Sequence, residues 1–392
     1  MEKIDILSLS PEMLGQYLAE MGEPKFRAKQ LFSWLHQKQV TSFDQMTTLS
    51  LQLRQKLNEK FCINRLNIAR KLASAADDTV KYLYELPDGN FVETVLMEYH
   101  HGKSLCISTQ VGCRMGCQFC ASTIAGYVRD LLPSELLLQI YETQRDAGCR
   151  IDSIVLMGIG EPLDNFDNVV QFFRLLSHPD GMQMSLRHAA LSTCGLVPQI
   201  RQLADLRLGV TLSVSLHSPE NARRSEIMPV NRRYPVEELL DACRYYFDTT
   251  GRRVTIEYAV INGVNNTAAD AGQLAKRLRG MQCHVNLIPV NPIKERSFRS
   301  FRKDVERFQK ELTGLGINAT IDLSTLMGSS DSMYYGGGMY MSDSGSGTVM
   351  SIIPIWLVLA AIGFAVVVGL LSGIVPASRA VRISALEAIR HD

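Results

Sequence analysis

Residues 105–120 read LCISTQVGCRMGCQFC, an apolar segment followed at once by three closely spaced cysteines. The apolar segment is typical of a buried β-strand. Cys113, Cys117 and Cys120 come after it at offsets of zero, four and seven, among glycines. This spacing predicts one tight loop that holds three thiol groups together just beyond the end of a strand.

Three thiols in one loop are compatible with several kinds of site. Soft thiolates select iron–sulfur clusters, zinc or copper(I). A structural zinc takes four protein ligands, and Cys106, upstream in the predicted strand, is the candidate for the fourth. On a four-iron cluster, three thiolates leave one iron open to a small molecule. Three buried cysteines without a metal are the remaining interpretation, which the loop character of the segment disfavours.

Strands and helices alternate from Ser104 to Ile321. Amphipathic helices such as 133–147 and 236–248 separate the strands. This spacing predicts an α/β fold with a parallel sheet, curved into a partial (β/α)6 barrel, with functional side chains at the carboxyl ends of the strands. The strand candidates are 105–109, 153–158, 188–193, 210–216, 254–260 and 284–290.

The residues before this barrel follow other patterns. Residues 1–75 are predicted to be a small helical domain, in which Ser10-Pro11-Glu12 has the composition of a helix start. Residues 80–98 alternate as a β-hairpin around the turn Pro87-Asp88-Gly89. The second helix is expected to carry one apolar face with basic neighbours, as a solvated rim or as an RNA contact; the face comprises Phe26, Leu31, Trp34 and Leu35, and the neighbours are Lys25, Arg27, Lys29 and Lys38.

The chain has 392 residues and is nearly neutral, with 41 basic and 40 acidic side chains. This balance excludes a wholly basic nucleic-acid coat and an acidic disordered chain. The nine cysteines are an odd number, and the N-terminus lacks the apolar run of a signal peptide. We therefore expect reduced cysteines and a cytoplasmic location rather than a disulfide framework.

The C-terminal part of the chain has a different composition. Residues 325–348 are rich in Gly and Ser, and 349–377 contain no charged side chain. Such a run exceeds the roughly 20 apolar residues of a spanning helix, so it predicts a transmembrane-like helix. The expected regions are a helical domain (1–75), a hairpin linker (76–103), a barrel (104–321), a Gly/Ser-rich linker (322–348) and a membrane-like tail (349–392).

The cysteine loop and a second motif resemble the radical S-adenosylmethionine (SAM) superfamily. The second motif is Met157-Gly-Ile-Gly-Glu-Pro162, which by itself would be an ordinary strand-to-helix turn. In that superfamily a [4Fe–4S] cluster on three cysteines chelates SAM through its open iron and cleaves it to a 5′-deoxyadenosyl radical. The glycine-rich strand end holds the SAM amino group.

The flanking sequences are similar to those of the dual-specificity adenine-C2 methyltransferases of 23S rRNA and tRNA. The likeness runs from about residue 5 to Thr320 and rests on LCISTQVGCRMGCQFCAS, VLMGIGEPLDN, LSTCGLVP, SVSLHSP, IMPVNRRYP and VNLIPVNP. The adenine-C8 methyltransferases of antibiotic resistance are the alternative. The Gly160-Glu161-Pro162 run favours the C2 enzymes.

The resemblance implies a ping-pong route at a carbon that has no acidic proton. A C-terminal cysteine is methylated by one SAM, and a second SAM provides the radical that takes hydrogen from that methyl group. The carbon radical adds to adenine C2, a base removes the C2 proton, and a second cysteine releases the product as a disulfide forms. The implied partners are 23S rRNA, tRNA and an electron donor such as flavodoxin.

The resemblance assigns roles to residues at matching positions. Cys113, Cys117 and Cys120 match the cluster ligands. Glu93 matches the base and Cys106 the resolving cysteine. The SAM contacts match Gly160, Glu161, Ser192, Ser215, Leu216, His217 and Asn291.

Each of these roles has a plainer alternative. Glu93 could be a solvated carboxylate, Cys106 a small core residue, and His217 a side chain that bonds a backbone carbonyl. The other cysteines are taken as structural. Basic residues at 223–224, 232–233, 252–253 and 294–303 could draw RNA as a local patch, in a protein with no overall basic charge.

After Thr320 the family likeness ends. The family continues with an arginine-rich strand and a D-I-D-A-A-C-G-Q-L motif that carries the methyl-accepting cysteine, whereas no cysteine follows Cys283 here. The tail instead resembles the last membrane segment of MacB/FtsX-type permeases, and a permease fragment is the second class of function. A plain hydrophobic tail anchor is the alternative. The charges of the tail would place the enzyme outside the cell, so we expect a fusion near 320–322, through recombination or a sequence-assembly join, and a membrane partner only if the tail is genuine.

Overall fold

The computed structural model describes residues 3–75, 77–100, 102–290 and 295–322. All of them belong to the first of two units into which the chain divides, Met1–Met339. The expected linker and membrane-like tail lie outside the described residues, apart from Asp322. Among the helices that the structure describes, none combines the length and the apolar composition needed to cross a bilayer.

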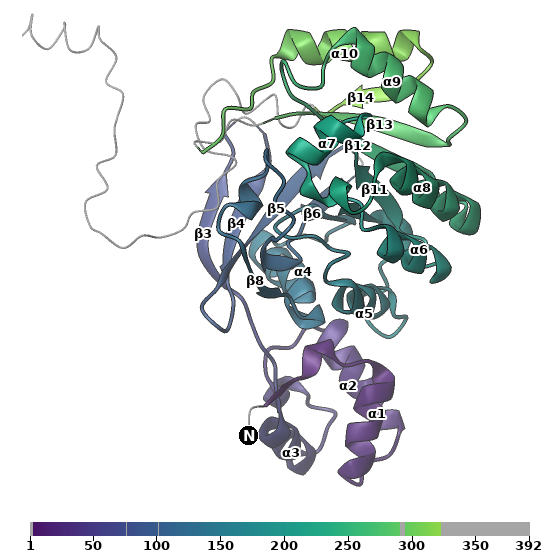
Figure 1. Cartoon of the computed structure of the whole chain (residues 1–392). Helices are drawn as coiled ribbons and strands as arrows, with labels where there is room; N and C mark the ends of the chain where they lie inside the picture. Colours follow the sequence, from purple (N-terminus) through teal and green to yellow (C-terminus); the bar gives the residue numbers. More distant parts are fainter. Residues whose placement is uncertain (1–2, 76, 101, 291–294, 323–392) are drawn as a thin grey trace, which may run out of the picture. The chain divides into compact units, whose positions relative to one another are not determined.

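One ten-stranded sheet organises the molecule, in the order β14-β13-β12-β11-β10-β9-β6-β5-β4-β3 (Figure 1). Its neighbours from β6 to β14 all pair in parallel. The parallel strands are β6 (Gly102–Cys106), β9 (Ser153–Leu156), β10 (Ala189–Thr193), β11 (Thr211–Ser215), β12 (Val254–Val260), β13 (Cys283–Pro289) and β14 (Ala319–Ile321). Five of the six predicted strands are therefore confirmed. The first is shifted, since β6 ends at Cys106 whereas 105–109 was expected, and β14 is a seventh strand that the sequence pattern did not indicate.

The two faces of this sheet differ in polarity. Residues paired across neighbouring strands point to the same side. One side carries buried apolar residues such as Leu191 and Leu212, which pair with each other. The other, which we call the inner face, carries Ser215 and Glu257, which also pair, together with other polar side chains. The apolar side forms the core under the connecting helices, and the inner face is left for chemistry.

The helices between the strands cover the apolar side of the sheet (Figure 1). Their burial follows the helical period; Phe172 and Phe173 of α5, for example, are fully buried. They are α4 (Pro133–Ala147), α5 (Phe166–Ser177), α6 (Val197–Asp205), α8 (Val236–Thr250), α9 (Ala268–Leu278) and α10 (Arg302–Gly314), with the short α7 (Asn221–Ile227) between β11 and α8.

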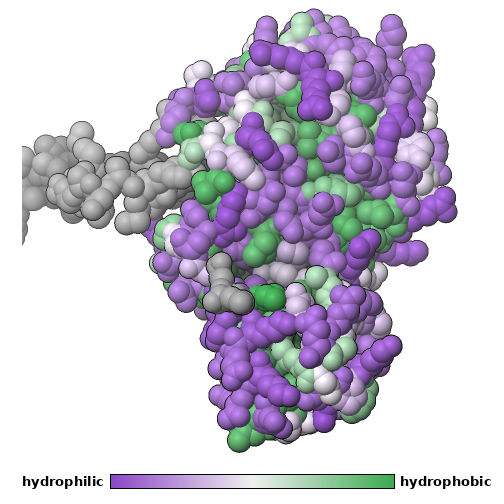
Figure 2. Space-filling view, turned by 60° about the horizontal axis from the view of Figure 1, so that its bottom comes forward, coloured by the Kyte–Doolittle hydropathy of each residue, from purple (hydrophilic) through white to green (hydrophobic). Residues whose placement is uncertain are grey.

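Three helices form most of the N-terminal region: α1 (Pro11–Glu20), α2 (Phe26–His36) and α3 (Leu51–Lys60). The predicted start of α1 is confirmed, because the Ser10 hydroxyl caps the helix by accepting from the Met13 N–H at 3.3 Å. Leu31 and Leu35 of α2 are buried as expected, but Phe26 at its first residue is 57% exposed. Figure 2 shows a largely hydrophilic surface with separate hydrophobic patches.

The predicted hairpin is confirmed as β4 (Val80–Glu85) and β5 (Phe91–Tyr99). It continues the barrel sheet, since β5 pairs antiparallel with β6. The expectation that 1–75 is wholly helical is wrong at its end, where β2 (Phe61–Cys62) and β3 (Asn67–Ala73) form. Almost every side chain of β3 is exposed, so no buried stripe marks the strand in the sequence. Its pairing with β4 decides its structure.

Candidate active site

The cysteine loop begins at the end of β7 (Gln110–Gly112), which pairs with β8 (Tyr127–Asp130). Gly112 has a φ of 72°, and a Cβ there would lie 1.8 Å from the Gly126 carbonyl oxygen. The Cys113 N–H donates to that same oxygen at 2.9 Å. Only glycine permits this closure, and it makes the intervening residues one compact loop.

The three thiols of the loop are electrostatic neighbours. Cys113 and Cys117 are buried and Cys120 is half-buried. Burial, followed by the neighbouring Cys120 thiol, raises the pKa of Cys113 to about 12. Burial and then the Cys120 and Cys113 thiols raise the pKa of Cys117. Buried thiols such as Cys113 and Cys117 need a positively charged metal centre to bind as thiolates.

The donor set of three soft thiolates fits an iron–sulfur cluster. Within the described ranges, no three metal-ligating side chains converge on a single ion position. A structural zinc would require four of them at about 2.3 Å from one centre. In a four-iron cluster each thiolate binds a different iron. Cys106 does not complete a zinc site, because its charged neighbours are Glu93 and Lys81 rather than the loop cysteines.

The glycine turn after β9 packs directly against the segment that leads to the cysteine loop. The Ile159 carbonyl accepts from the Thr109 N–H at 2.8 Å, and the Glu161 N–H donates to the Gln110 side chain at 2.8 Å. Gly160 has a φ of 109°, and a Cβ there would lie 2.6 Å from the Gln110 Cβ. The turn is glycine-rich because two backbones meet there without room for a side chain.

We expect Gly160→Ala to destabilise the protein by about 1–3 kcal/mol, through strain and collision with Gln110. SAM affinity should fall as well, because the turn has to move away from the cysteine loop. Gly263→Ala is the matched control, since Gly263 also has a positive φ, 72°, but open space around its Cβ position. Denaturant unfolding and equilibrium dialysis with SAM check both; equal losses in the two variants would contradict the packing argument.

Glu161 is held in a fixed orientation beside the turn. Its carboxylate accepts from the Cys194 N–H at 2.7 Å and from the Leu163 N–H at 3.1 Å. Burial raises the pKa of Glu161, and these hydrogen bonds oppose the rise. The Thr193 and Cys194 side chains also hydrogen-bond to this carboxylate, so its position is fixed from several sides.

The ends of β10 and β11 bring the other expected SAM contacts to the same edge. Ser192 and Ser215 lie on the inner face, at the carboxyl ends of these two strands. Leu216 follows and is fully buried. Asn291 lies outside the described residues, so the structure does not place it.

His217 connects this edge to the cysteine loop. Its ring packs edge-on against Phe119, with the centroids 4.8 Å apart. Its Nδ1 accepts from the Ala259 N–H at 2.8 Å, which leaves the proton on Nε2. Burial, with the nearby Arg224 charge, lowers the pKa of His217 to about 3, so the ring stays neutral. The partner is thus a backbone N–H and not the carbonyl considered from the sequence.

A separate group on the inner face contains the expected base and the expected resolving thiol. Lys81 Nζ forms an ion pair with Glu93 Oε1 at 2.7 Å, with only 14% and 24% of the two side chains exposed. Val95, two residues from Glu93, is the cross-strand partner of both Lys81 and Cys106. Burial raises the pKa of Cys106 to about 11; a hydrogen bond with the Met157 backbone opposes the rise, Glu93 adds to it, and Lys81 opposes it. Glu93 is therefore not a solvated surface carboxylate.

Three residues of this edge were missed or misread from the sequence. Lys81 belongs to no sequence motif, and Glu257 lies in an ordinary strand pattern. The Glu257 carboxylate accepts from Asn286 Nδ2 at 2.8 Å, and burial raises its pKa to about 7. Arg224 was grouped with basic residues that could draw RNA, but it is fully buried. No local signal in the sequence distinguishes it from its exposed neighbours.

The other basic pairs are only partly available to RNA. Arg223 forms an ion pair with Asp270, and Arg252 donates to the Thr211 hydroxyl at 2.7 Å. Arg232 and Arg233 are exposed. Of these four arginines, Arg232 and Arg233 remain the better candidates for contacts with RNA.

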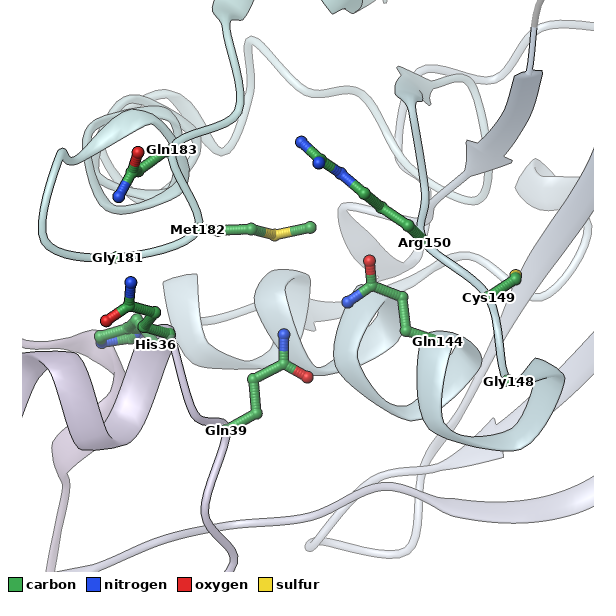
Figure 3. A pocket seen from close by; sticks show the side chains of 10 residues that line it. His36, Gln39, Gln144, Gly148, Cys149, Arg150, Gly181, Met182 and Gln183 are labelled. Atoms are coloured by element: carbon green, nitrogen blue, oxygen red, sulfur yellow. The ribbon is translucent and has the colours of Figure 1, made fainter.

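A large surface cavity lies away from these residues (Figure 3). Its volume is about 570 Å³, and polar side chains such as Gln39, Gln144 and Arg150 point into it. Gly148 and Arg150 follow α4 and precede β9, so this cavity borders the amino ends of the parallel strands. None of the expected site residues lines it, and we do not assign the chemistry to it.

Three thiols lie on a loop after the first parallel strand and face a glycine turn and the ends of the next strands. This arrangement defines a radical SAM enzyme. This class uses a [4Fe–4S] cluster and SAM. The sequence model of the radical SAM superfamily matches residues 107–274, and that of the ribosomal RNA large subunit methyltransferase N-terminal domain matches residues 4–63.

The chain belongs to the family of RlmN dual-specificity RNA methyltransferases. It is 51% identical over 318 residues to the probable dual-specificity RNA methyltransferase RlmN of Lachnospira eligens, covering 81% of this chain and 91% of the relative. The Clostridium novyi relative is 48% identical, with 81% and 93% covered. A crystal structure of a radical SAM methyltransferase from Sphaerobacter thermophilus matches at 40% identity with a TM-score of 0.78, covering 81% and 95%.

Two expectations are corrected by these findings. The location derived from the sequence, an enzyme that also carries a membrane segment, is wrong: the relatives match over nine-tenths of their length and are named as RNA methyltransferases. The disulfide implied for turnover also finds no support, because all nine cysteines are free.

Proposed function

We propose that this enzyme architecture is built to methylate C2 of adenosine in 23S rRNA, at the peptidyl-transferase centre, and in tRNA, at the base 3′ of the anticodon. The observation that carries the proposal is that Glu93, Cys106 and Lys81 lie together on the inner face of the ten-stranded sheet. The relatives' name, dual-specificity RNA methyltransferase, supports two RNA substrates. The Gly160-Glu161-Pro162 run supports C2 over C8.

The residues divide the work as follows. Cys113, Cys117 and Cys120 hold the cluster, which together with SAM supplies radical chemistry when bound. Glu161 orients the SAM amino group, and Gly160, Ser192, Ser215, Leu216, His217 and the undescribed Asn291 complete the SAM contacts. Glu93 accepts the proton from adenine C2 at its carboxylate, which forms an ion pair with the Lys81 ammonium at 2.7 Å. Cys106 matches the thiol that, in the family, forms a disulfide with the methyl-carrying cysteine as the S–C bond to the product breaks. An external donor such as flavodoxin supplies electrons.

The division of labour between domains is part of the same proposal. The helical region 1–75 would help to bind RNA, the hairpin 76–103 would carry Glu93, and the barrel 104–321 would hold the cluster and SAM. The segments 322–348 and 349–392 have no role in it. Mass spectrometry of nucleosides after reaction with an rRNA fragment tests the proposal: 2-methyladenosine supports it, and 8-methyladenosine would replace it with the C8 activity.

We further propose that the chain as given is impaired in turnover. In the family, the methyl group passes through a cysteine within D-I-D-A-A-C-G-Q-L, and here the sequence continues DLSTLMGSSDS from residue 322 without any later cysteine. Cys106 is already assigned to release and cannot serve both roles in one cycle.

The proton-handling group makes a prediction that does not need turnover. We expect Lys81→Met to raise the pKa of Cys106 further, and Glu93→Gln to lower it, because the ammonium stabilises the thiolate and the carboxylate opposes it. Alkylation of Cys106 at pH 9 should slow by roughly threefold or more in the first variant and accelerate in the second.

Mass spectrometry of the peptide that contains Cys106 gives its alkylation rate as a function of pH. Lys71→Met is the matched control, because Lys71 lies on the neighbouring strand β3 but pairs with Asp146. If the alkylation rate of Cys106 changed with pH in the same way in Lys81→Met and Lys71→Met, the grouping of Lys81 with Cys106 would be contradicted.

A further inference from the structure

Arg224 of α7 is a fully buried arginine beneath the cysteine loop. Its guanidinium makes four hydrogen bonds. The Nε donates to the Leu216 carbonyl at 2.9 Å and Nη1 to Asn231 Oδ1 at 2.9 Å. The Nη2 donates to the carbonyls of Cys194 at 2.8 Å and Ser215 at 3.0 Å. All four acceptors are neutral, so the hydrogen bonds do not neutralise the charge.

No carboxylate in the described part of the chain forms an ion pair with Arg224. The adjacent Arg223 shows the contrast, because it pairs with Asp270 and Glu220. Burial lowers the pKa of Arg224 to about 10, which still leaves the group charged at neutral pH. An isolated buried cation is costly unless a negative charge is held nearby.

The cysteine ligands become negative when they bind metal as thiolates. Arg224 Nη2 donates to the backbone carbonyl of Cys194 at 2.8 Å, and Ile227 of the same helix packs against Cys194 and Cys117. Cys117 is an expected cluster ligand, and it shares a small apolar cluster with Cys194, Ile227 and Met228. The Gln118 N–H donates to the Ile227 carbonyl at 2.8 Å, which ties the loop to the end of α7. The positive charge and the loop are therefore held together in apolar surroundings, where charges interact strongly.

We propose that the Arg224 guanidinium is the fixed counter-charge of the iron–sulfur cluster and raises its reduction potential. In the reduction the cluster takes one electron from a low-potential one-electron donor and becomes more negative by one unit; no bond forms or breaks and no proton moves. A fixed positive charge in a water-poor setting stabilises the more negative state. The effect concerns electron entry only and is independent of whether C2 or C8 is the methylated carbon.

A purely structural role is the alternative, since Arg224 also holds the carbonyls of Cys194, Ser215 and Leu216 in place. Arg224→Gln removes the charge, and Arg224→Lys keeps it while losing the planar fork. Asn231→Asp leaves Arg224 intact and puts a carboxylate against its Nη1, so it neutralises the charge in place. Arg223→Gln is the matched control, the same chemical change one residue away at an arginine already paired.

The experiment is an anaerobic redox titration of the full-length chain, reconstituted with iron and sulfide and reduced with dithionite, with the reduced cluster measured by electron paramagnetic resonance. At a fixed solution potential, we expect the ratio of reduced to oxidised cluster to fall at least tenfold in Arg224→Gln and in Asn231→Asp, which for one electron is a shift of about 59 mV. Arg224→Lys should change the ratio less than threefold, and Arg223→Gln should leave it unchanged.

An Arg224→Gln protein that holds a full cluster at the parent potential would overturn the proposal. So would a shift in Arg224→Lys as large as that in Arg224→Gln, because hydrogen-bond geometry would then be the cause. If Arg224→Gln does not fold, Asn231→Asp decides, since it keeps every Arg224 donor. If the cluster of Asn231→Asp then has the reduction potential of the parent, the counter-charge role is refuted. A change in the methylated carbon alone would bear only on the proposed function.

Discussion

The Cys113→Ala variant of the full-length chain is expected to show no iron–sulfur absorbance after anaerobic reconstitution and no conversion of SAM to 5′-deoxyadenosine. Cys113 is one of three thiols on a loop that Gly112 and Gly126 close. The motif supplies three ligands, so one lost ligand leaves two, too few to hold a four-iron cluster with an open iron. The loss should be complete rather than graded.

Cys106→Ala is the control that separates a cluster from zinc. Its thiol lies on β6 beside Glu93, so the variant should keep the iron content and the absorbance of the parent. Iron and sulfide analysis, absorbance spectra and chromatography of the SAM products check both variants. Tight stoichiometric zinc with no iron uptake in the parent, abolished in both variants, would show that the four-thiol interpretation was right.

The second large effect concerns turnover: the chain as given should cleave SAM slowly and place no methyl group on RNA. The cysteine loop, the glycine turn and the expected SAM contacts that the structure describes lie at one edge of the sheet, so we expect reductive cleavage to persist without a methyl acceptor. Loss of a covalent nucleophile removes the route itself rather than part of the transition-state binding energy. Radiolabelled SAM with an rRNA fragment, followed by nucleoside analysis, measures the transfer.

A version with the family's D-I-D-A-A-C-G-Q-L ending grafted after Ile321 should restore labelling. The junction lies where β14 is already paired, since Leu287 pairs with Ile321 and its carbonyl accepts from the Asp322 N–H at 2.9 Å. The same graft with its cysteine changed to alanine separates the thiol from any gain in stability at the sheet edge. Label in adenine from the ungrafted chain at the graft's rate would show that another residue carries the methyl group.

Local signals in the sequence were sufficient for much of the fold. The six main parallel strands, the hairpin and the start of α1 at Ser10 all follow from apolar periodicity, turn residues and capping, which act within a few residues. The cysteine spacing and the glycines of 157–162 likewise reflect backbone geometry at one place. These features could be predicted because the physical constraint and the residues that satisfy it are close together in the chain.

Elements that depend on a partner could not be predicted in this way. β3 has an exposed sequence and forms by pairing with β4, and β14 has three residues and forms by pairing with β13. Phe26 matches the apolar pattern of α2 but lies at its first residue, where it is exposed. For such short or terminal pieces, pairing and packing outweigh intrinsic preference.

The sequence by itself determined which chemistry-bearing residues the molecule has: the three cysteines, the glycine turn and the family likeness that assigned Glu93 and Cys106. Only the tertiary structure decided which of them meet. Strand register places Lys81 beside Glu93 and Cys106, and the docking of α7 buries Arg224 while its neighbour Arg223 stays at the surface. Burial and the pairing of charges depend on contacts between distant segments, and no local pattern encodes which side of a short charged helix will face the core.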